Sequence, residues 1–146
     1  MKKSQRLRPV QQLKQREERT QARKLAEIQS QLADSRRQLG ELESYLEDYF
    51  STVNNQQRMI HSATQLGQYQ NFISKLKLAI EHQREDIKQR ESALKAQTKL
   101  WALSRSQLNS MDELIEKSRF QEAVEEEKKA QKQMDDRPFK GGGGFS

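Results

Sequence analysis

The sequence predicts an all-α protein, a long two-helix antiparallel coiled-coil hairpin with a frayed N-terminus and a disordered Gly-rich tail. Of its 146 residues, 32% are hydrophobic and 33% charged, which is too few apolar residues for an ordinary globular core. The two prolines are Pro9 and Pro138, and the chain between them is rich in good helix formers such as Gln, Lys, Glu and Leu. Apolar residues also recur every seven positions in both halves, as in coiled coils.

The chain begins with a basic N-terminal segment, 1–9, which we expect to be frayed. From residue 10 the pattern is helical and predicts a first coiled-coil helix over 10–54. Its apolar residues follow alternating steps of three and four, which places them at heptad positions a and d. The aliphatic residues predicted for its core are Leu25, Ile28, Leu32, Leu39 and Leu46. Gly40 costs about 1 kcal/mol relative to Ala, which is not enough to end the helix.

A connecting turn is predicted over 55–67. The apolar repeat stops at two asparagines, and the residues that follow show no firm periodicity. Ser62, Thr64 and Gly67 supply the turn and capping chemistry expected between two helices.

A second coiled-coil helix with a charged extension is predicted over 68–136, followed by a flexible tail over 137–146 that contains four consecutive glycines. Its predicted core positions recur every seven residues at Ile73, Ile80, Ile87, Leu94, Trp101, Leu108 and Ile115. The d residues between them are mostly polar, which disfavours a parallel homodimer because d meets d there. An antiparallel hairpin places each a residue against a d residue, so we expect a monomer when the protein is free.

The expected hairpin register follows from a turn centred near residue 61. It pairs Tyr49 with Ile73 and Leu42 with Ile80, and each layer that we considered then contains an aliphatic residue. A register slipped by one heptad is the main alternative.

Charge is distributed unevenly along the chain. Residues 1–24 carry nine Lys/Arg against Glu17 and Glu18, a local charge of +7, whereas residues 112–136 carry nine Asp/Glu against five Lys/Arg, a local charge of −4. A basic segment can bind nucleic acid. We favour the interpretation that the two ends neutralise one another, and expect no nucleic-acid partner, because no nucleic-acid motif accompanies the charge.

The sequence offers no set of catalytic residues. It has no cysteine, and its one glycine cluster lacks the Lys of a phosphate-binding loop. His82 lies near Glu85 and Asp86, but such a lone histidine on an exposed helix is far more often solvated surface than a metal ligand. We expect no cofactor, no metal and no enzyme activity. The absence of an apolar run after the basic start, and of a membrane-span window, predicts a soluble cytoplasmic protein.

A stripe of apolar side chains is predicted beside the coiled-coil seam near the turn. In both helices the g and d residues there lean to the same edge. The register places Gln38 beside Gln83 and Tyr49 beside Phe72. We predict a partner-binding patch formed by Gln38, Leu42, Tyr45, Tyr49, Phe72, Leu76, Ala79 and Gln83. Aromatic side chains in a polar rim are typical interface anchors. The alternative is that these aromatics fold over the seam and stabilise the hairpin.

The run from Tyr69 through Gln70, Asn71 and Phe72 to Ile73, followed by Leu76, Ala79, Ile80 and Gln83, resembles the motif of the FliJ family of flagellar export proteins. The resemblance implies a cytoplasmic stalk of the bacterial type III export apparatus, peripherally associated with the inner-membrane machinery. It implies as partners the hexamer of the export ATPase FliI, the cytoplasmic domain of the export gate protein FlhA, and export chaperones. The predicted patch matches the positions at which the family contacts the gate.

Two other functions stay open at this point. A basic coiled coil could bind nucleic acid through its N-terminal residues, in which case binding should weaken steeply as salt rises. A structural coiled coil could self-assemble, in which case sedimentation would show oligomers instead of a monomer.

Overall fold

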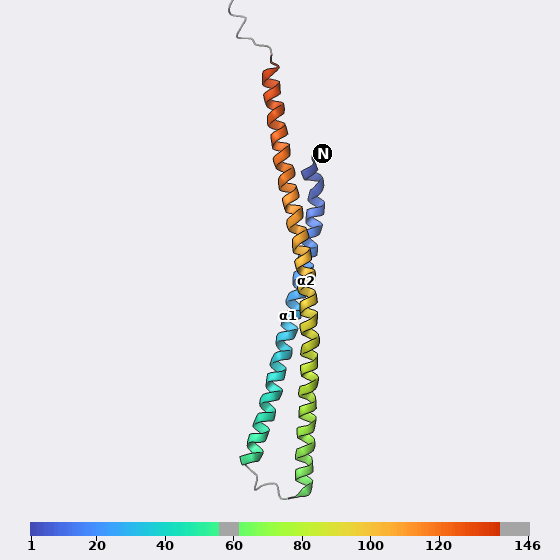
Figure 1. The fold of residues 1–146 in the computed structure, drawn as a ribbon, viewed down its shortest axis with the longest axis vertical. Coiled ribbons are helices and arrows are strands. Elements are labelled where there is room, and N and C mark those ends of the chain that lie inside the picture. Colours follow the sequence, from blue (N-terminus) through green and yellow to red (C-terminus); the bar gives the residue numbers. More distant parts are fainter. Residues whose placement is uncertain (56–61, 138–146) are drawn as a thin grey trace, which may run out of the picture. The chain divides into compact units, whose positions relative to one another are not determined.

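The computed structural model describes residues 1–55 and 62–137 and contains two helices there, α1 over Lys3–Asn55 and α2 over Ala63–Asp135. The helices pair in antiparallel fashion, so the predicted two-helix hairpin is confirmed (Figure 1). The chain divides into two compact units. The hairpin unit is Thr20–Trp101, and the terminal unit combines Met1–Arg19 with the chain from Ala102 onward.

The core of the hairpin unit is the seam between α1 and α2. Leu32 is its most enclosed side chain, at 2% exposure. The α2 side chains buried there repeat with heptad spacing and are Ile73, Leu76, Ile80 and Ile87. The other predicted core residues of this unit are half-buried, namely Leu25, Ile28, Leu39, Leu46, Leu94 and Trp101. Two helices enclose each side chain from fewer directions than a globular core does, which explains the partial burial.

Contacts across the seam establish the register of the hairpin unit. The Gln83 side chain donates a hydrogen bond to Gln38, and the rings of Tyr49 and Phe72 lie 4.6 Å apart. Both pairs are the ones that the predicted register brings together. A slip of one heptad would separate each pair by about two helical turns, roughly 10 Å, so that alternative is wrong for this unit.

In the terminal unit α1 starts at Lys3, seven residues before the predicted start at residue 10. The heptad continues upstream with polar residues at most core-facing positions: Ser4 is buried, and Leu7, Gln11 and Lys14 are half-buried. From α2 this unit buries Ser104, Leu108, Ile115 and Ser118. Pro9 lies in the second turn of α1, where its missing N–H removes one intrahelical hydrogen bond.

A carboxylate from α2 explains why the first residues of α1 are helical instead of frayed. The first N–H groups of a helix have no partner within the helix. Glu122 accepts hydrogen bonds from the Ser4 backbone N–H at 3.0 Å and from the Ser4 hydroxyl at 2.7 Å. Its negative charge also complements the positive end of the helix dipole. These hydrogen bonds lower the pKa of the Glu122 carboxyl below its usual value.

Acidic residues of α2 lie along the basic start of the chain in the terminal unit. Lys2 pairs with Glu126, which raises the pKa of the lysine. The Gln11 amide donates to Asp112 at 2.6 Å. These contacts agree with the interpretation that the two charged ends partly neutralise one another.

The α2 helix begins at Ala63, five residues before the predicted start at residue 68. Ser62 caps it: its hydroxyl accepts a hydrogen bond from the Gln65 N–H at 3.2 Å, and its carbonyl accepts one from the Leu66 N–H at 3.2 Å. The predicted connection over 55–67 is therefore helical at its end, and residues 56–61 lie outside the described residues.

At its C-terminal end α2 stops at Asp135, one residue before the predicted end at 136. The predicted flexible tail lies outside the described residues from Pro138 onward. Within the part of the chain that the structure describes, neither helix has a stretch long and apolar enough to cross a membrane.

Candidate partner-binding surface

The eight residues of the predicted patch lie in the hairpin unit, but they are not equally accessible. Tyr45 is the most exposed large side chain of the set, at 55%. Gln38 and Ala79 are also exposed, whereas Leu42, Tyr49, Phe72 and Gln83 are half-buried. Leu76 is 8% exposed and belongs to the core, so it can support the patch but offers little surface to a partner.

Four aromatic rings form a continuous cluster across the two helices. Phe72 of α2 contacts Tyr45 edge-on, with ring centroids 6.0 Å apart, and contacts Tyr49 at 4.6 Å. Tyr49 also stacks on Tyr69 at 5.2 Å and an interplanar angle of 14°. Such ring pairs add about 0.5–1.5 kcal/mol beyond the area they bury. The aromatics therefore do both things considered from the sequence: they fold over the seam, and Tyr45 leaves one ring available.

Tyr69 belongs to this cluster although the predicted patch omits it. The signal was present in the sequence, because Tyr69 stands seven residues before Leu76 and therefore at a d position. Its half-buried ring continues the aromatic row toward the start of α2.

An open pocket of about 430 Å³ lies next to Tyr45 on this edge. Its lining residues are Gln38, Glu41, Leu42, Tyr45 and Gln83. Four of the five belong to the predicted patch, and Glu41 is the addition. A mostly apolar pocket beside an exposed aromatic ring could bind a side chain of a partner protein.

The two glutamines of the patch are held by hydrogen bonds. The Gln83 amide nitrogen donates to the Ser35 backbone carbonyl at 2.9 Å and to the Gln38 side-chain oxygen at 3.2 Å. This bridge joins α1 and α2 at one end of the pocket. Gln83 therefore links the two helices beside the patch.

On the opposite edge of the hairpin unit, charged side chains of α2 contact α1. Arg84 lies 3.2 Å from Glu43, and the Lys77 ammonium lies 5.8 Å from the centre of the Phe50 ring. A smaller hollow on that edge, about 310 Å³, is lined by four charged residues with Leu46 and Ile80. The two edges thus differ in chemistry: one is aromatic with amides, the other is ion-paired.

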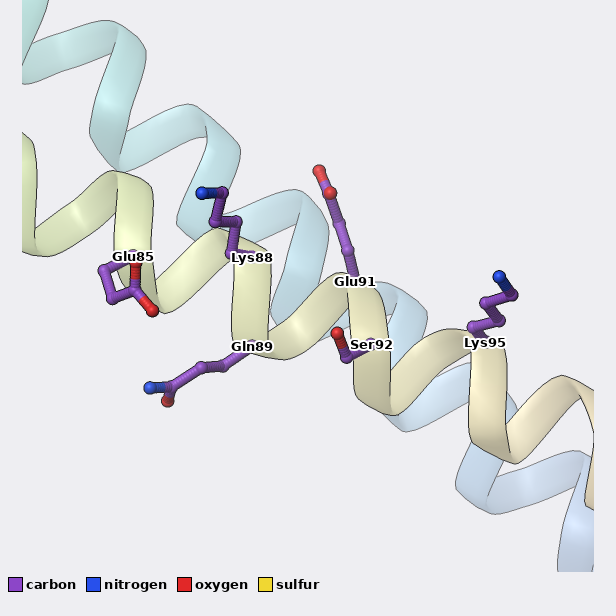
Figure 2. A pocket seen from close by; sticks show the side chains of 6 residues that line it. All are labelled: Glu85, Lys88, Gln89, Glu91, Ser92 and Lys95. Carbon is purple, nitrogen blue, oxygen red and sulfur yellow. The ribbon is translucent and has the colours of Figure 1, made fainter.

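A depression on the surface of α2 offers no chemistry of its own (Figure 2). Its six lining side chains are exposed residues of α2 between Glu85 and Lys95 that point in different directions, and one of them, Glu91, pairs with Arg36 of α1. Mixed charges at helical spacing are typical of a solvated face. Among the described residues no group of three or more His, Cys, Asp or Glu side chains is arranged to hold a metal ion.

The fold defines a class of protein, an all-α coiled-coil hairpin. Comparison with known protein families identifies the particular protein. The family model described as Flagellar FliJ protein matches residues 2–138, so the chain belongs to the FliJ family. The protein is thus a coiled-coil stalk component of the flagellar export apparatus and not an enzyme. No curated protein and no solved structure gives a significant match to the chain.

Proposed function

We propose that this protein links the ring of the export ATPase FliI to the export gate protein FlhA, promotes assembly of the ring, and contacts the gate through the patch in the hairpin unit. The single observation that carries the gate contact is the 55% exposure of Tyr45 beside the apolar pocket. An aromatic ring that stands beside a pocket on the surface is a typical binding anchor. The protein would work in the cytoplasm at the membrane-embedded export machinery and escort export chaperones.

The proposed mechanism is mechanical and allosteric. A hairpin held at one end by the ATPase ring can bias the gate only if its patch binds one gate conformation better than another. The terminal unit would engage the ring. Its basic start and the acidic stretch of α2 over 112–136 are both remote in sequence from the patch. When free, the protein would be a monomer, because the aliphatic side chains of the a/d seam are already used within one chain.

The experiment is a pull-down with the FlhA cytoplasmic domain and, separately, with FliI. The test variant is Tyr45→Ala, and the matched control is Phe50→Ala, which removes an aromatic ring from the opposite, ion-paired edge. We expect Tyr45→Ala to lose most of the FlhA contact and to retain FliI, with unchanged helicity by circular dichroism. Equal loss of FlhA in both variants, or no loss in either, would overturn the assignment of the patch.

A further inference from the structure

A cluster of polar side chains crosses the seam of the hairpin unit. The Ser35 hydroxyl, in a residue only 4% exposed, donates a 2.8 Å hydrogen bond to Asp86. Arg90 Nε donates to the same Asp86 oxygen at 2.8 Å, and Arg90 Nη1 donates to the Gln31 side-chain oxygen at 3.3 Å. We call Gln31, Ser35, Asp86 and Arg90 the polar cluster.

The aliphatic a positions of α2 do not select one register by themselves. Three successive a positions of α2 carry the same side chain, Ile73, Ile80 and Ile87, and all three are buried. If α2 shifted by seven residues along α1, one of these isoleucines would take the place of the next, for example Ile80 the place of Ile73. At these positions the burial of apolar area, which is non-directional, would change little between the two registers.

The polar cluster does select one register. Seven residues to either side of Asp86 stand Ala79 and Ala93, and seven residues to either side of Ser35 stand Ile28 and Leu42. After a slip of one heptad in either direction, the Ser35 hydroxyl would face an alanine and the Asp86 carboxylate would face an aliphatic side chain. A slip therefore leaves the Ser35 hydroxyl buried without a partner, and it leaves the Asp86 carboxylate with the Arg90 donor of its own helix but without the serine donor. Both losses are penalised.

Ion pairs on the opposite edge also favour the observed register. Arg36 lies 3.3 Å from Glu91, and Glu43 lies 3.2 Å from Arg84. A slip one way would bring Arg36 beside Arg84, and a slip the other way would bring Glu43 beside Glu91. Because exposed charge pairs contribute little individually, they assist the polar cluster and do not replace it.

We propose that the polar cluster sets the register of the hairpin and thereby assembles the partner-binding patch from its two halves. The patch is composite: Tyr45 comes from α1 and Phe72 from α2. A slip of one heptad displaces one half by about 10 Å and separates these rings. The Gln83 bridge to Ser35 and Gln38 ties the cluster directly to the edge of the patch. The role in register is independent of the partner, whereas the role in gate binding rests on the proposed function.

The test uses cross-linking between introduced cysteines in the full chain, which has none of its own. The exposed pair Arg36→Cys and Glu91→Cys reports the native register with a short bis-maleimide. Arg36→Cys with Arg84→Cys, and Arg36→Cys with Thr98→Cys, report the two slipped registers. With the polar cluster intact we expect efficient cross-linking of the native pair alone. In a Ser35→Ala/Asp86→Ala background we expect the slipped cross-links to rise about tenfold relative to the native one.

The matched control is Asp34→Ala/Arg37→Ala, which removes an acid and a base that pair within α1 at 3.5 Å without crossing the seam. It should leave the cross-linking pattern unchanged. Asp86→Asn, which keeps an acceptor but not the charge, is a milder second variant that should give a smaller rise. If neither variant raises the slipped cross-links, the polar cluster does not set the register. If they rise while FlhA binding of the same variants is intact, but Tyr45→Ala still abolishes it, the link to the patch is wrong and the proposed function stands.

Discussion

Ser4 and Glu122 are joined by two hydrogen bonds, from the backbone N–H and from the hydroxyl of the serine, across 118 residues of sequence. This contact caps α1 with a side chain of another helix, whereas most caps come from the residue just before the helix. It explains how a basic segment that contains Pro9 can be helical from Lys3. The start of α1 therefore depends on the acidic part of α2.

The first prediction concerns this cap. Ser4→Ala removes one of the two hydrogen bonds and should destabilise the start of α1 by about 1 kcal/mol. Glu122→Gln, which also removes the charge at the helix N-terminus, should have a larger effect. Amide hydrogen exchange over residues 4–10 should become faster in both variants, with no change over 70–90. Glu116→Gln, an exposed acid on the same helix, is the control and should leave exchange unaltered.

The second prediction separates binding residues from core residues within the patch. Tyr45→Ala should cost about 0.5–1.5 kcal/mol, because Tyr45 is 55% exposed and the change removes its edge-on contact with the Phe72 ring. Leu76→Ala should cost about 2–4 kcal/mol, because Leu76 is 8% exposed. Urea unfolding followed by circular dichroism measures both. Similar costs for the two variants would show that Tyr45 is a packing residue and not a free anchor.

The sequence was sufficient to predict the hairpin, its register near the turn and the edge on which the aromatics lie. Heptad spacing determines these features, because residues seven apart must share a helix face. Heptad spacing and a turn centred near residue 61 together predict that Gln38 lies beside Gln83 and Tyr49 beside Phe72. Both contacts are present in the structure.

The helix ends could not be predicted in the same way. The start of α1 depends on Glu122, and heptad analysis of α1 alone could not identify it because Ser4, Gln11 and Lys14 are polar. The start of α2 depends on Ser62. The sequence indicated Ser62 as a capping residue, but the turn was predicted to extend to residue 67, whereas the helix begins at Ala63. The burial of Leu76 and the membership of Tyr69 in the aromatic cluster, by contrast, agree with the d positions that both residues occupy.

The third prediction concerns Gly40 in the middle of α1. A Cβ added there would meet nothing within 4 Å, and the backbone is helical. Gly40→Ala should therefore stabilise the protein by about 1 kcal/mol, because glycine loses more conformational freedom on folding than alanine. Thermal unfolding of the variant should show a higher midpoint with the same helicity. A lower midpoint would mean that α1 needs a flexible residue here.

The fourth prediction concerns acid. Hydrogen bonds from Arg90 and Ser35 lower the pKa of the Asp86 carboxyl below its ordinary 3.8, and the backbone N–H and hydroxyl of Ser4 lower that of Glu122 below its ordinary 4.5. A carboxyl with a lowered pKa in the folded state binds fewer protons there than in the unfolded chain, so its stabilising contribution is present above its ordinary pKa and is lost as the pH falls through the folded-state pKa. The melting temperature should accordingly fall on acidification below about pH 4.5. The Asp86→Asn/Glu122→Gln variant should show a weaker fall over the same range, and an equal fall in both proteins would mean that other carboxyls cause the acid sensitivity.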